Sequence, residues 1–291
     1  MNSTKLALPL MLALACASAA ADVIPSLGVA QQFAVLGAQS VTNTNATTLH
    51  GDLGVSPGTS ITGADSVTFA AGGSIHQTDS TAMQAQSDAQ GAYTALAALT
   101  GGVDLSGRDL GTLGVLNPGV YFFSSSAALT GNLTLDFGND QSGVFVFQIG
   151  STLTTAADSM VNVINGTRSN GIYFQVGSSA SLGSGSDIAG NILAQQSITF
   201  GSAANIACGR ALALTGSVTM IGNTVSNDCS AYGGPGMASD FGSAGYSGIG
   251  LAVLPPVDVP EPGSLALFAI GLLAAAYSVM RRRPAMMRAR Q

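Results

Sequence analysis

Hydroxyl side chains recur at matched positions in the second half of this chain, and they are the residues most able to form a site. In each repeat an apolar residue lies between two small residues, so on a β-strand the apolar side chain points inward and its neighbours point outward. The apolar residues are Leu153, Leu182, Ile198 and Val218, and Gly183 stands where a hydroxyl is expected after Leu182. The outward hydroxyl residues are Thr152, Thr154, Ser181, Ser197, Thr199, Ser217 and Thr219.

Strands that stack about 4.8 Å apart would bring these hydroxyls into two ranks on a flat, rigid grid. Such an uncharged surface can hydrogen-bond ordered water and leave room for water around the threonine methyl groups, whereas charged groups would impose their own hydration shells. It would bind through many weak contacts in register, prepared by a rigid frame. Two other interpretations stay open. Serine and threonine are also ordinary solvent-facing strand residues, and the same grid suits a repetitive polysaccharide.

Catalytic and metal-binding groups are not gathered anywhere in the sequence. His50 and His76 have no cysteine or carboxylate at metal-ligand spacing, so we expect no metal and no cofactor. The run 183–186 (GSGS) lacks the lysine of a phosphate loop. A polysaccharide-cleaving β-helix would need clustered carboxylates, but the acids are scattered and mostly at turn positions. These acids are Asp136, Asp140, Asp158, Asp187 and Asp228. We therefore expect that the protein is not an enzyme.

Repeated phrases predict the elements that must position the hydroxyls. The phrase at 147–151 (FQIGS) returns at 174–178 (FQVGS), and the phrase at 190–194 (GNILA) returns at 209–213 (GRALA). Periods in this range, with short alternating runs and glycine at the corners, are typical of stacked β-coils. We expect a mainly β protein, a β-solenoid over 22–230 whose coils have three short strands each. The insert at 165–170 is expected to be a surface loop between coils.

One segment breaks the strand pattern and predicts a long helix. Apolar residues recur there at steps of three and four, as in an amphipathic helix over about 78–100. They are Ala82, Ala85, Ala89, Ala92, Leu96 and Leu99. Thr78 or Asp79 can cap its start, and Gly101 ends it. We expect this helix to lie along one face of the solenoid and to make the strand at 144–147 apolar on both sides. A coiled coil between chains is the alternative.

Charge is distributed unevenly along the chain. All fifteen acidic residues lie between Asp22 and Glu261, where Arg108, Arg168 and Arg210 are the only basic residues, so this body carries a net charge of −12. Phosphate binding needs clustered lysine or arginine. Nucleic acid is therefore an unlikely partner.

The start of the chain reads as an export signal. Residues 1–21 combine one early lysine, an apolar run and small residues at the end, which predicts a secretory signal peptide cleaved before Asp22. A lipoprotein signal at Cys16 fits less well. Export leaves Cys208 and Cys229, 21 residues apart or about one coil, which could pair in an oxidising compartment. Two unpaired small core residues are the alternative.

The end of the chain has three parts after a Gly/Ser/Pro linker at 231–258. Pro260, Glu261 and Pro262 precede an apolar segment at 263–280, long enough to span a membrane, and three arginines follow at 281–283. This tail, 259–291, resembles the PEP-CTERM sorting signal of Gram-negative bacteria. The resemblance implies cleavage near Pro260, Glu261 and Pro262 by an exosortase and release to the cell surface or the extracellular matrix. A permanent anchor is the alternative.

The order of these phrases resembles one family, the ice-binding (antifreeze) proteins of the DUF3494 type. The resemblance runs from about residue 27 to 226 and includes the helix. It rests on the segments 33–37 (FAVLG), 41–44 (VTNT), 51–58 (GDLGVSPG), 116–121 (LNPGVY), 144–154 (VFVFQIGSTLT) and 190–194 (GNILA). It implies a right-handed, three-faced β-solenoid with one long helix alongside, into which the segment before the helix also packs.

The same resemblance implies that the hydroxyl grid is a flat face that adsorbs to ice and inhibits its recrystallisation and growth. Members of the family use differing residues on that face, and this chain has no strict Thr-x-Thr array. We therefore expect moderate activity, exerted more on recrystallisation than on the freezing point. The alternative from a different class is a surface adhesin or a component of an exopolysaccharide matrix. We expect a monomer.

Overall fold

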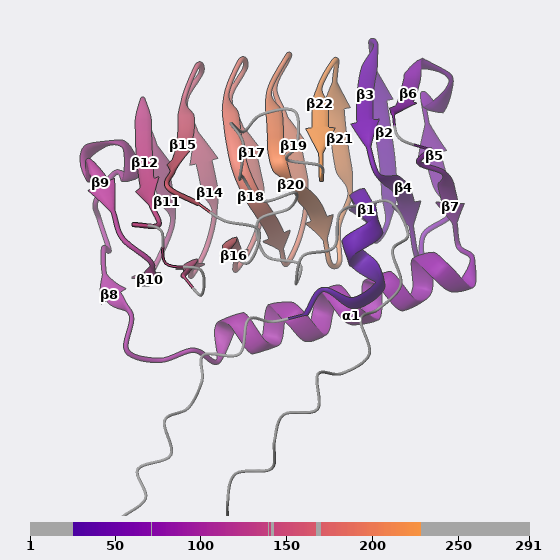
Figure 1. Ribbon diagram of the computed structural model, residues 1–291. Helices are drawn as coiled ribbons and strands as arrows, with labels where there is room; N and C mark the ends of the chain where they lie inside the picture. Colours follow the sequence, from indigo (N-terminus) through magenta and orange to yellow (C-terminus); the bar gives the residue numbers. More distant parts are fainter. Residues whose placement is uncertain (1–25, 71, 139, 141–142, 167–169, 228–291) are drawn as a thin grey trace, which may run out of the picture. The chain divides into compact units, whose positions relative to one another are not determined.

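Short parallel strands and one α-helix make up the described part of the chain, in the computed structural model of Figure 1. The structure describes residues 26–70, 72–138, 140, 143–166 and 170–227. The chain separates into two compact units, Met1–Gly250 and Leu251–Gln291, and every described residue belongs to the first. The predicted signal peptide at 1–21, the linker at 231–258 and the tail at 259–291 lie outside the described residues. The fold is thus mainly β, with parallel sheets and one helix, as expected.

The strands form one 15-stranded and one seven-stranded sheet, in which every pair is parallel. The larger sheet consists of two ladders of paired strands. The long strands β18 and β20 belong to both ladders and thereby join them into one sheet. The helix ladder has the spatial order β7 (Ile75–Gln77), β4 (Asp52–Val55), β1 (Phe33–Gly37), β20 (Asn205–Ala213), β18 (Asp187–Ala194), β16 (Gly171–Val176), β13 (Val144–Ile149), β10 (Gly119–Phe123) and β8 (Val103–Asp104).

The seven-stranded sheet is the hydroxyl ladder, and the third ladder includes the first halves of β18 and β20. The hydroxyl ladder has the order β11 (Ala127–Leu129), β14 (Leu153–Thr155), β17 (Ala180–Leu182), β19 (Ile198–Phe200), β21 (Val218–Ile221), β2 (Ser40–Thr44) and β5 (Ser60–Thr62). The third ladder adds β9 (Val115–Leu116), β12 (Asn132–Asp136), β15 (Met160–Ile164), β22 (Thr224–Ser226), β3 (Thr47–His50) and β6 (Val67–Ala70). Three 3-10 turns occur at η1 (Gly28–Gln32), η2 (Ala64–Ser66) and η3 (Leu110–Thr112).

Along the chain, the strands visit the helix ladder, the hydroxyl ladder and the third ladder in turn, and one such pass is a coil. The predicted repeat is confirmed, since Phe147 of β13 pairs with Phe174 of β16, 27 residues later. At the corner inside β20, a Cβ on Gly209 would lie 1.8 Å from the carbonyl oxygen of Gly190. This corner therefore requires glycine, as the repeated phrase suggested.

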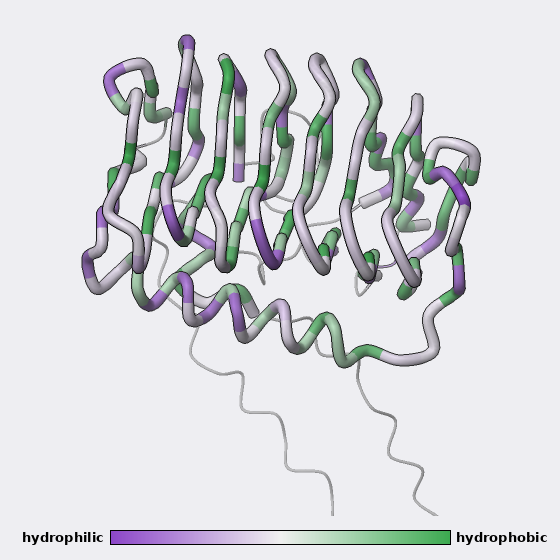
Figure 2. Tube along the Cα trace, turned by 180° about the vertical axis from the view of Figure 1, so that it is seen from behind, coloured by the Kyte–Doolittle hydropathy of each residue, from purple (hydrophilic) through white to green (hydrophobic). Residues whose placement is uncertain are grey.

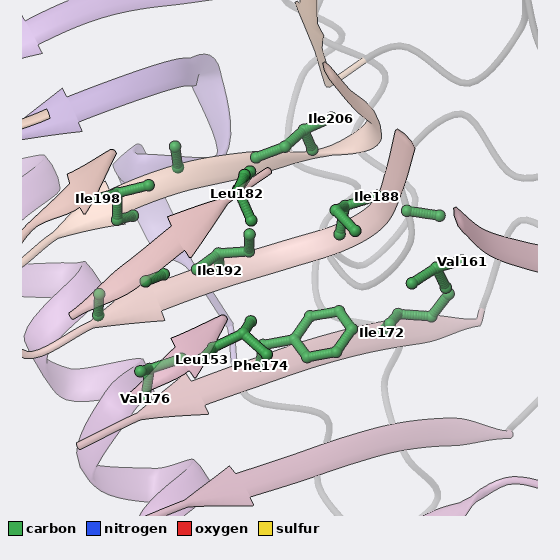
Figure 3. Close-up of a cluster of buried hydrophobic side chains, with 14 of the residues drawn as sticks. Leu153, Val161, Ile172, Phe174, Val176, Leu182, Ile188, Ile192, Ile198 and Ile206 are labelled. Carbon is green, nitrogen blue, oxygen red and sulfur yellow. The ribbon is translucent and has the colours of Figure 1, made fainter. Parts of the chain in front are cut away.

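Aligned apolar side chains fill the interior. Tyr121, Phe147 and Phe174 occupy matching positions in three successive coils, and their ring centroids are 5.4 and 4.9 Å apart. Figure 2 shows apolar residues returning at similar places in neighbouring coils, and Figure 3 shows Leu182 and Ile198 among the inward side chains. Each coil therefore buries its apolar side chains against those of its neighbours.

The helix α1 (Ser80–Ala97) is shorter at both ends than the predicted 78–100. Asp79 is its N-cap, and the Asp79 carboxylate accepts a hydrogen bond from the backbone N–H of Ala82 over 2.8 Å. At the other end, Nε2 of Gln148 donates to the carbonyl oxygens of Leu96 and Leu99 over 2.7 and 2.9 Å. This side chain from β13 fixes the end of the helix, so the long-range contact rather than the local sequence sets the boundary.

The predicted stripe of α1 is buried against the helix ladder. Its buried residues are Ala82, Ala85, Ala89, Ala92 and Leu96. Ala85, Ala89, Ala92 and Leu96 share one apolar cluster with Leu36, Val146, Tyr173, Leu193 and Leu212 of the ladder. The neighbours of Val146 in β13, Phe145 and Phe147, lie in the interior cluster instead. The expectation that 144–147 is apolar on both sides is thus confirmed.

The two ends of the described chain meet in the middle of the stack. Val35 of β1 pairs with Ala211 of β20, and Val41 of β2 pairs with Val218 of β21. The coils before α1 therefore continue the stack that the coils after it build, and α1 carries the chain from β7 at one end towards β8 at the other (Figure 1). The segment before the helix packs with the rest, as the resemblance implied.

No helix in the described part of the chain is both long and apolar enough to cross a membrane. The predicted span at 263–280 falls outside that part.

Candidate functional site

The outward surface of the hydroxyl ladder carries one residue per strand in a central rank. Register pairs join its members across all seven strands. The central rank consists of Ala128, Thr154, Ser181, Thr199, Thr219, Thr42 and Thr62, in spatial order. Six of its seven members carry a hydroxyl, and every member is exposed or half-buried.

A second rank lies two residues before the central rank in the chain, at the corner where the chain enters the hydroxyl ladder. This corner rank consists of Ser126, Thr152, Ser179, Ser197, Ser217, Ser40 and Ser60. All seven members carry a hydroxyl. The two predicted ranks therefore exist, and the residues singled out from the sequence divide between them.

The structure corrects one assignment between the ranks. The sequence placed Ser181 and Gly183 around Leu182, which would put Gly183 beside Thr154. Instead, Leu153 pairs with Ala180 and Thr154 pairs with Ser181. Ala180 is buried as the inward residue, so the hydroxyl matching Thr152 is that of Ser179. The error came from choosing the larger Leu182 as the inward anchor, although the 27-residue step already led from Leu153 to Ala180.

Several members of the face were missed by sequence reasoning. They are Thr42 and Thr62 in the central rank and Ser40, Ser60, Ser126 and Ser179 in the corner rank. Most of them belong to the triplets at 40–42 (SVT), 60–62 (SIT) and 179–181 (SAS), which match 197–199 (SIT) and 217–219 (SVT). A search of the whole chain for hydroxyl, apolar, hydroxyl triplets would have found these three.

The frame behind the face is rigid and apolar. Val41, Leu153, Ile198 and Val218 lie between the two ranks and are at most 2% exposed. Charged side chains are absent from both ranks. The inward anchors therefore hold the hydroxyls from behind, and no member of either rank imposes a charged hydration shell.

One carboxylate lies at the β11 end of the face. Asp109 bridges to Ala128, and its Oδ1 accepts hydrogen bonds from the backbone N–H groups of Gly111 and Thr130 over 2.8 and 2.9 Å. Burial pushes the pKa of Asp109 upward, but these hydrogen bonds outweigh it and hold the pKa below its ordinary value. Asp109 thus stays ionised while it closes the turn that ends the ladder.

Two carboxylates lie close to His76, although the sequence analysis found none at metal-ligand spacing. Its Nδ1 lies 2.7 Å from Oδ2 of Asp79, and its Nε2 lies 3.6 Å from Oδ2 of Asp52, which comes from the adjacent strand β4. The pKa of Asp79 is lowered, first by the hydrogen bond from Ala82 and then by His76. Among the described residues no group of histidine, cysteine and acidic side chains is arranged to hold a metal ion.

The third ladder has a cavity of about 240 Å³ that is lined mostly by unreactive side chains. Its lining includes Met160, Val163 and Ala189, and Asp187 is the one carboxylate among the lining residues. Cys208 also lines it and takes part in a disulfide bond. Cys229 lies outside the described residues, so its pairing with Cys208 stays a prediction.

The fold and the hydroxyl face together define a protein whose regular site is an extended, repetitive surface rather than a cleft. Residues 35–226 match the sequence model of a family described as Ice-binding-like, and the chain belongs to that family. This family is not defined by an enzymatic activity. A second match, at 258–283, is to the PEP-CTERM protein-sorting motif, which indicates a secreted or cell-surface protein.

Similar proteins support the family assignment. An ice-binding protein of Nostoc sp. (strain HG1) is 52% identical over 211 residues, which cover 72% of this chain and 77% of the relative. The crystal structure of an ice-binding protein from an Antarctic biological consortium has a TM-score of 0.65 and 43% identity, and the match covers 69% of this chain and 90% of the other. A structure from the Antarctic ascomycete Antarctomyces psychrotrophicus has a TM-score of 0.63 and 39% identity, and covers 69% of this chain and 97% of the other.

Proposed function

We propose that this protein binds ice through the hydroxyl face and thereby restrains the recrystallisation and growth of ice. The observation that carries the proposal is the pair of ranks on seven parallel strands, 13 of whose 14 members are serine or threonine. Membership of the Ice-binding-like family supports the same function.

Adsorption to ice would depend on the regular spacing of the hydroxyls and on many weak contacts. Parallel strands repeat at about 4.8 Å, so the central rank presents its hydroxyl and methyl groups at a regular spacing. Each contact with water in the ice surface is weak, but all of them form together because the buried anchors have already fixed the geometry. Free energy that would otherwise be lost in ordering side chains is retained for adsorption.

We propose that the three ladders form a right-handed, three-faced β-solenoid with α1 packed along the face of the helix ladder. The strand order supports three faces, because successive strands visit the three ladders in turn. The right-handed sense follows from the strong preference of parallel crossover connections.

We propose that the protein is exported from a Gram-negative bacterium and that an exosortase processes its tail near Pro260, Glu261 and Pro262. The PEP-CTERM match supports this fate. An adhesin or a protein of the exopolysaccharide matrix is the second candidate, because the same signal and the same hydroxyl grid would suit attachment to a repetitive polymer. We propose that the protein acts as a monomer and without a cofactor.

The first test measures ice recrystallisation and crystal shape with purified protein of residues 22–258. We expect faceted crystals and arrested grain growth at micromolar protein. Round, freely coarsening crystals from a folded, β-rich sample would reject ice binding, and glycan binding would then test the adhesin.

Bulky substitutions then locate the face. Thr199→Tyr and Thr219→Tyr should each abolish ice shaping without unfolding the protein, because both side chains point to solvent from the central rank. A matched control, Thr68→Tyr, places the same ring on an exposed position of β6 in the third ladder and should leave ice shaping unchanged. Unchanged shaping in both central-rank variants, or an equal loss in the control, would move the site to another face.

A further inference from the structure

The two ranks of the hydroxyl face differ in how their hydroxyls are used. In the corner rank, Oγ of Ser179 accepts a hydrogen bond from the backbone N–H of Ser197 over 3.3 Å. Oγ of Ser197 in turn accepts from the backbone N–H of Ser217 over 3.1 Å. The hydroxyl of Ser40 donates to Oγ of Ser217 over 2.8 Å. These bonds form a continuous chain from β17 through β19 and β21 to β2.

The same pattern recurs near the other end of the ladder. The hydroxyl of Thr152 donates to Oγ of Ser126 over 2.7 Å. Packing at the corner is also tight, since a Cβ on Gly216 would lie 2.3 Å from Oγ of Ser197. The corner rank therefore consists largely of hydroxyls that are already committed to neighbouring coils.

The central rank is different. In the described part of the chain, the hydroxyls of Thr154, Ser181, Thr199, Thr219, Thr42 and Thr62 make no hydrogen bond to another protein group. They stand on the strands between buried anchors and are half-buried or exposed. Their donors and acceptors are available to water.

We infer that the central rank contacts ice, whereas the corner rank positions the strands and contributes little to ice contact itself. The inference rests on the proposed ice-binding function. Most corner hydroxyls already use one hydrogen-bonding position on a neighbouring coil, which restricts how the hydroxyl can turn towards ice, whereas every position of a central hydroxyl is open to water or ice. Corner-rank residues are thus positioning residues, and central-rank residues set the affinity.

The positioning role matters most where the two ends of the chain meet. The hydrogen bond between Ser40 and Ser217 joins β2, from before the helix, to β21, from the last coil. Thr42 and Thr219 are the next outward residues on these two strands and pair in register. The corner bond therefore keeps the central rank continuous across the junction.

The test removes one hydroxyl at a time from a single strand of the full chain. Thr219→Ala deletes a hydroxyl on β21, Ser217→Ala deletes one at the corner just before β21, and Ser217→Thr keeps an Oγ at the corner. For each variant we measure the lowest protein concentration that stops ice recrystallisation and the melting temperature.

We expect Thr219→Ala to raise that concentration about threefold and to leave the melting temperature unchanged, since it interrupts the central rank, whose weak contacts act together. Ser217→Ala should lower the melting temperature and shift the concentration by less than about twofold, because alanine removes a corner bond and no ice contact. Ser217→Thr should restore the melting temperature, since its Oγ replaces the lost acceptor.

The outcomes separate the two claims. If wild-type protein fails to stop recrystallisation, the proposed function is rejected and this inference with it. If wild-type protein is active but Ser217→Ala weakens it as much as Thr219→Ala does, with an unchanged melting temperature, the corner rank contacts ice and the division of roles is wrong. The division is also wrong if Thr219→Ala leaves activity unchanged.

Discussion

Arg210 is fully buried although it carries a charge, and its guanidinium ties the last coil to the first. Nε and Nη2 donate to the backbone carbonyl oxygen of Gln31 over 2.9 and 2.7 Å, and Nη1 donates to Oδ1 of Asn191 over 2.8 Å. Gln31 belongs to η1 and Arg210 to β20, so these bonds join segments 179 residues apart in sequence. This side chain thus reinforces the strand pairing that joins the two ends of the fold.

We expect Arg210→Met to lower the free energy of unfolding by about 2–4 kcal/mol, since two buried oxygens each lose a charged donor. Methionine keeps most of the volume, so the loss reports the hydrogen bonds rather than a cavity. Urea unfolding measures the effect. Arg108→Met, at an exposed position, should change stability by less than about 0.5 kcal/mol. An equal effect of the two substitutions would contradict the role of Arg210.

Asp109 makes the free energy of unfolding depend on pH. Its folded pKa is lower than its ordinary value, so the ionised carboxylate stabilises the protein above the pKa of the unfolded chain. This stabilisation should be present above about pH 4 and disappear as the pH falls through the lower folded pKa. In Asp109→Asn, the free energy of unfolding should therefore fall less steeply below pH of about 4 than in wild type. An unchanged slope in Asp109→Asn would contradict this role of the carboxylate.

Among the elements, α1 shows how a face of small residues sets a distance. Alanine at positions Ala85, Ala89 and Ala92 lets the helix backbone approach the outward side chains of the helix ladder closely. Larger side chains come from the ladder, including Tyr173 and Leu193. Small side chains of the helix thus pack against large side chains of the strands.

Overpacking of this interface should be costly. We expect Ala89→Leu to destabilise the protein by about 1–3 kcal/mol, because Ala89 is fully buried and the added atoms have no space. Ala95→Leu adds the same atoms on the exposed side of α1 and should have little effect. Thermal unfolding of the two variants measures the difference. If Ala89→Leu is tolerated as well as Ala95→Leu, the interface is looser than the structure indicates.

Some features of the elements could be predicted from the sequence, and others could not. The helix stripe and the stacked repeat were predictable, because a period of 3.6 and a phrase returning 27 residues later are local patterns. The end of α1 was not, because Gln148 from a distant strand determines it. The position of Ser181 was misassigned because Ala180 is a weak apolar signal. The triplets that contain Thr42 and Thr62 could have been found by a local search, but their place in the rank depends on β2 lying next to β21 in space, which no local pattern encodes.

At the scale of the whole molecule, sequence order and spatial order differ. The coils that come first in the chain stack on the coil that comes last, through β1 against β20 and β2 against β21. The first coils therefore cannot complete their pairing until the chain as far as β22 has formed, because β3 pairs with β22. Contacts of such high sequence separation are expected to slow folding.

A circular permutant tests this idea. The chain 26–227 can be rejoined by a short linker from Asn227 to Ser26 and opened between Ala98 and Val103, since Asn227 donates to the carbonyl oxygen of Gln31 over 3.3 Å and the two ends are close. Each coil would then follow its spatial neighbour in sequence. We expect the permutant to refold faster than the unpermuted 26–227 chain in stopped-flow experiments, with similar ice binding. Equal or slower refolding would show that the junction does not limit folding.

The length of α1 matches the length of the strand stack that it spans. It contacts β7 near one end of the stack and β13 towards the other, six strand spacings apart or about 29 Å. Its 18 residues rise by about 27 Å, nearly the same length. Each additional coil would widen the hydroxyl face by about 4.8 Å and would need roughly three more helical residues to return the chain. A natural or engineered relative with a wider face should therefore carry a proportionally longer helix.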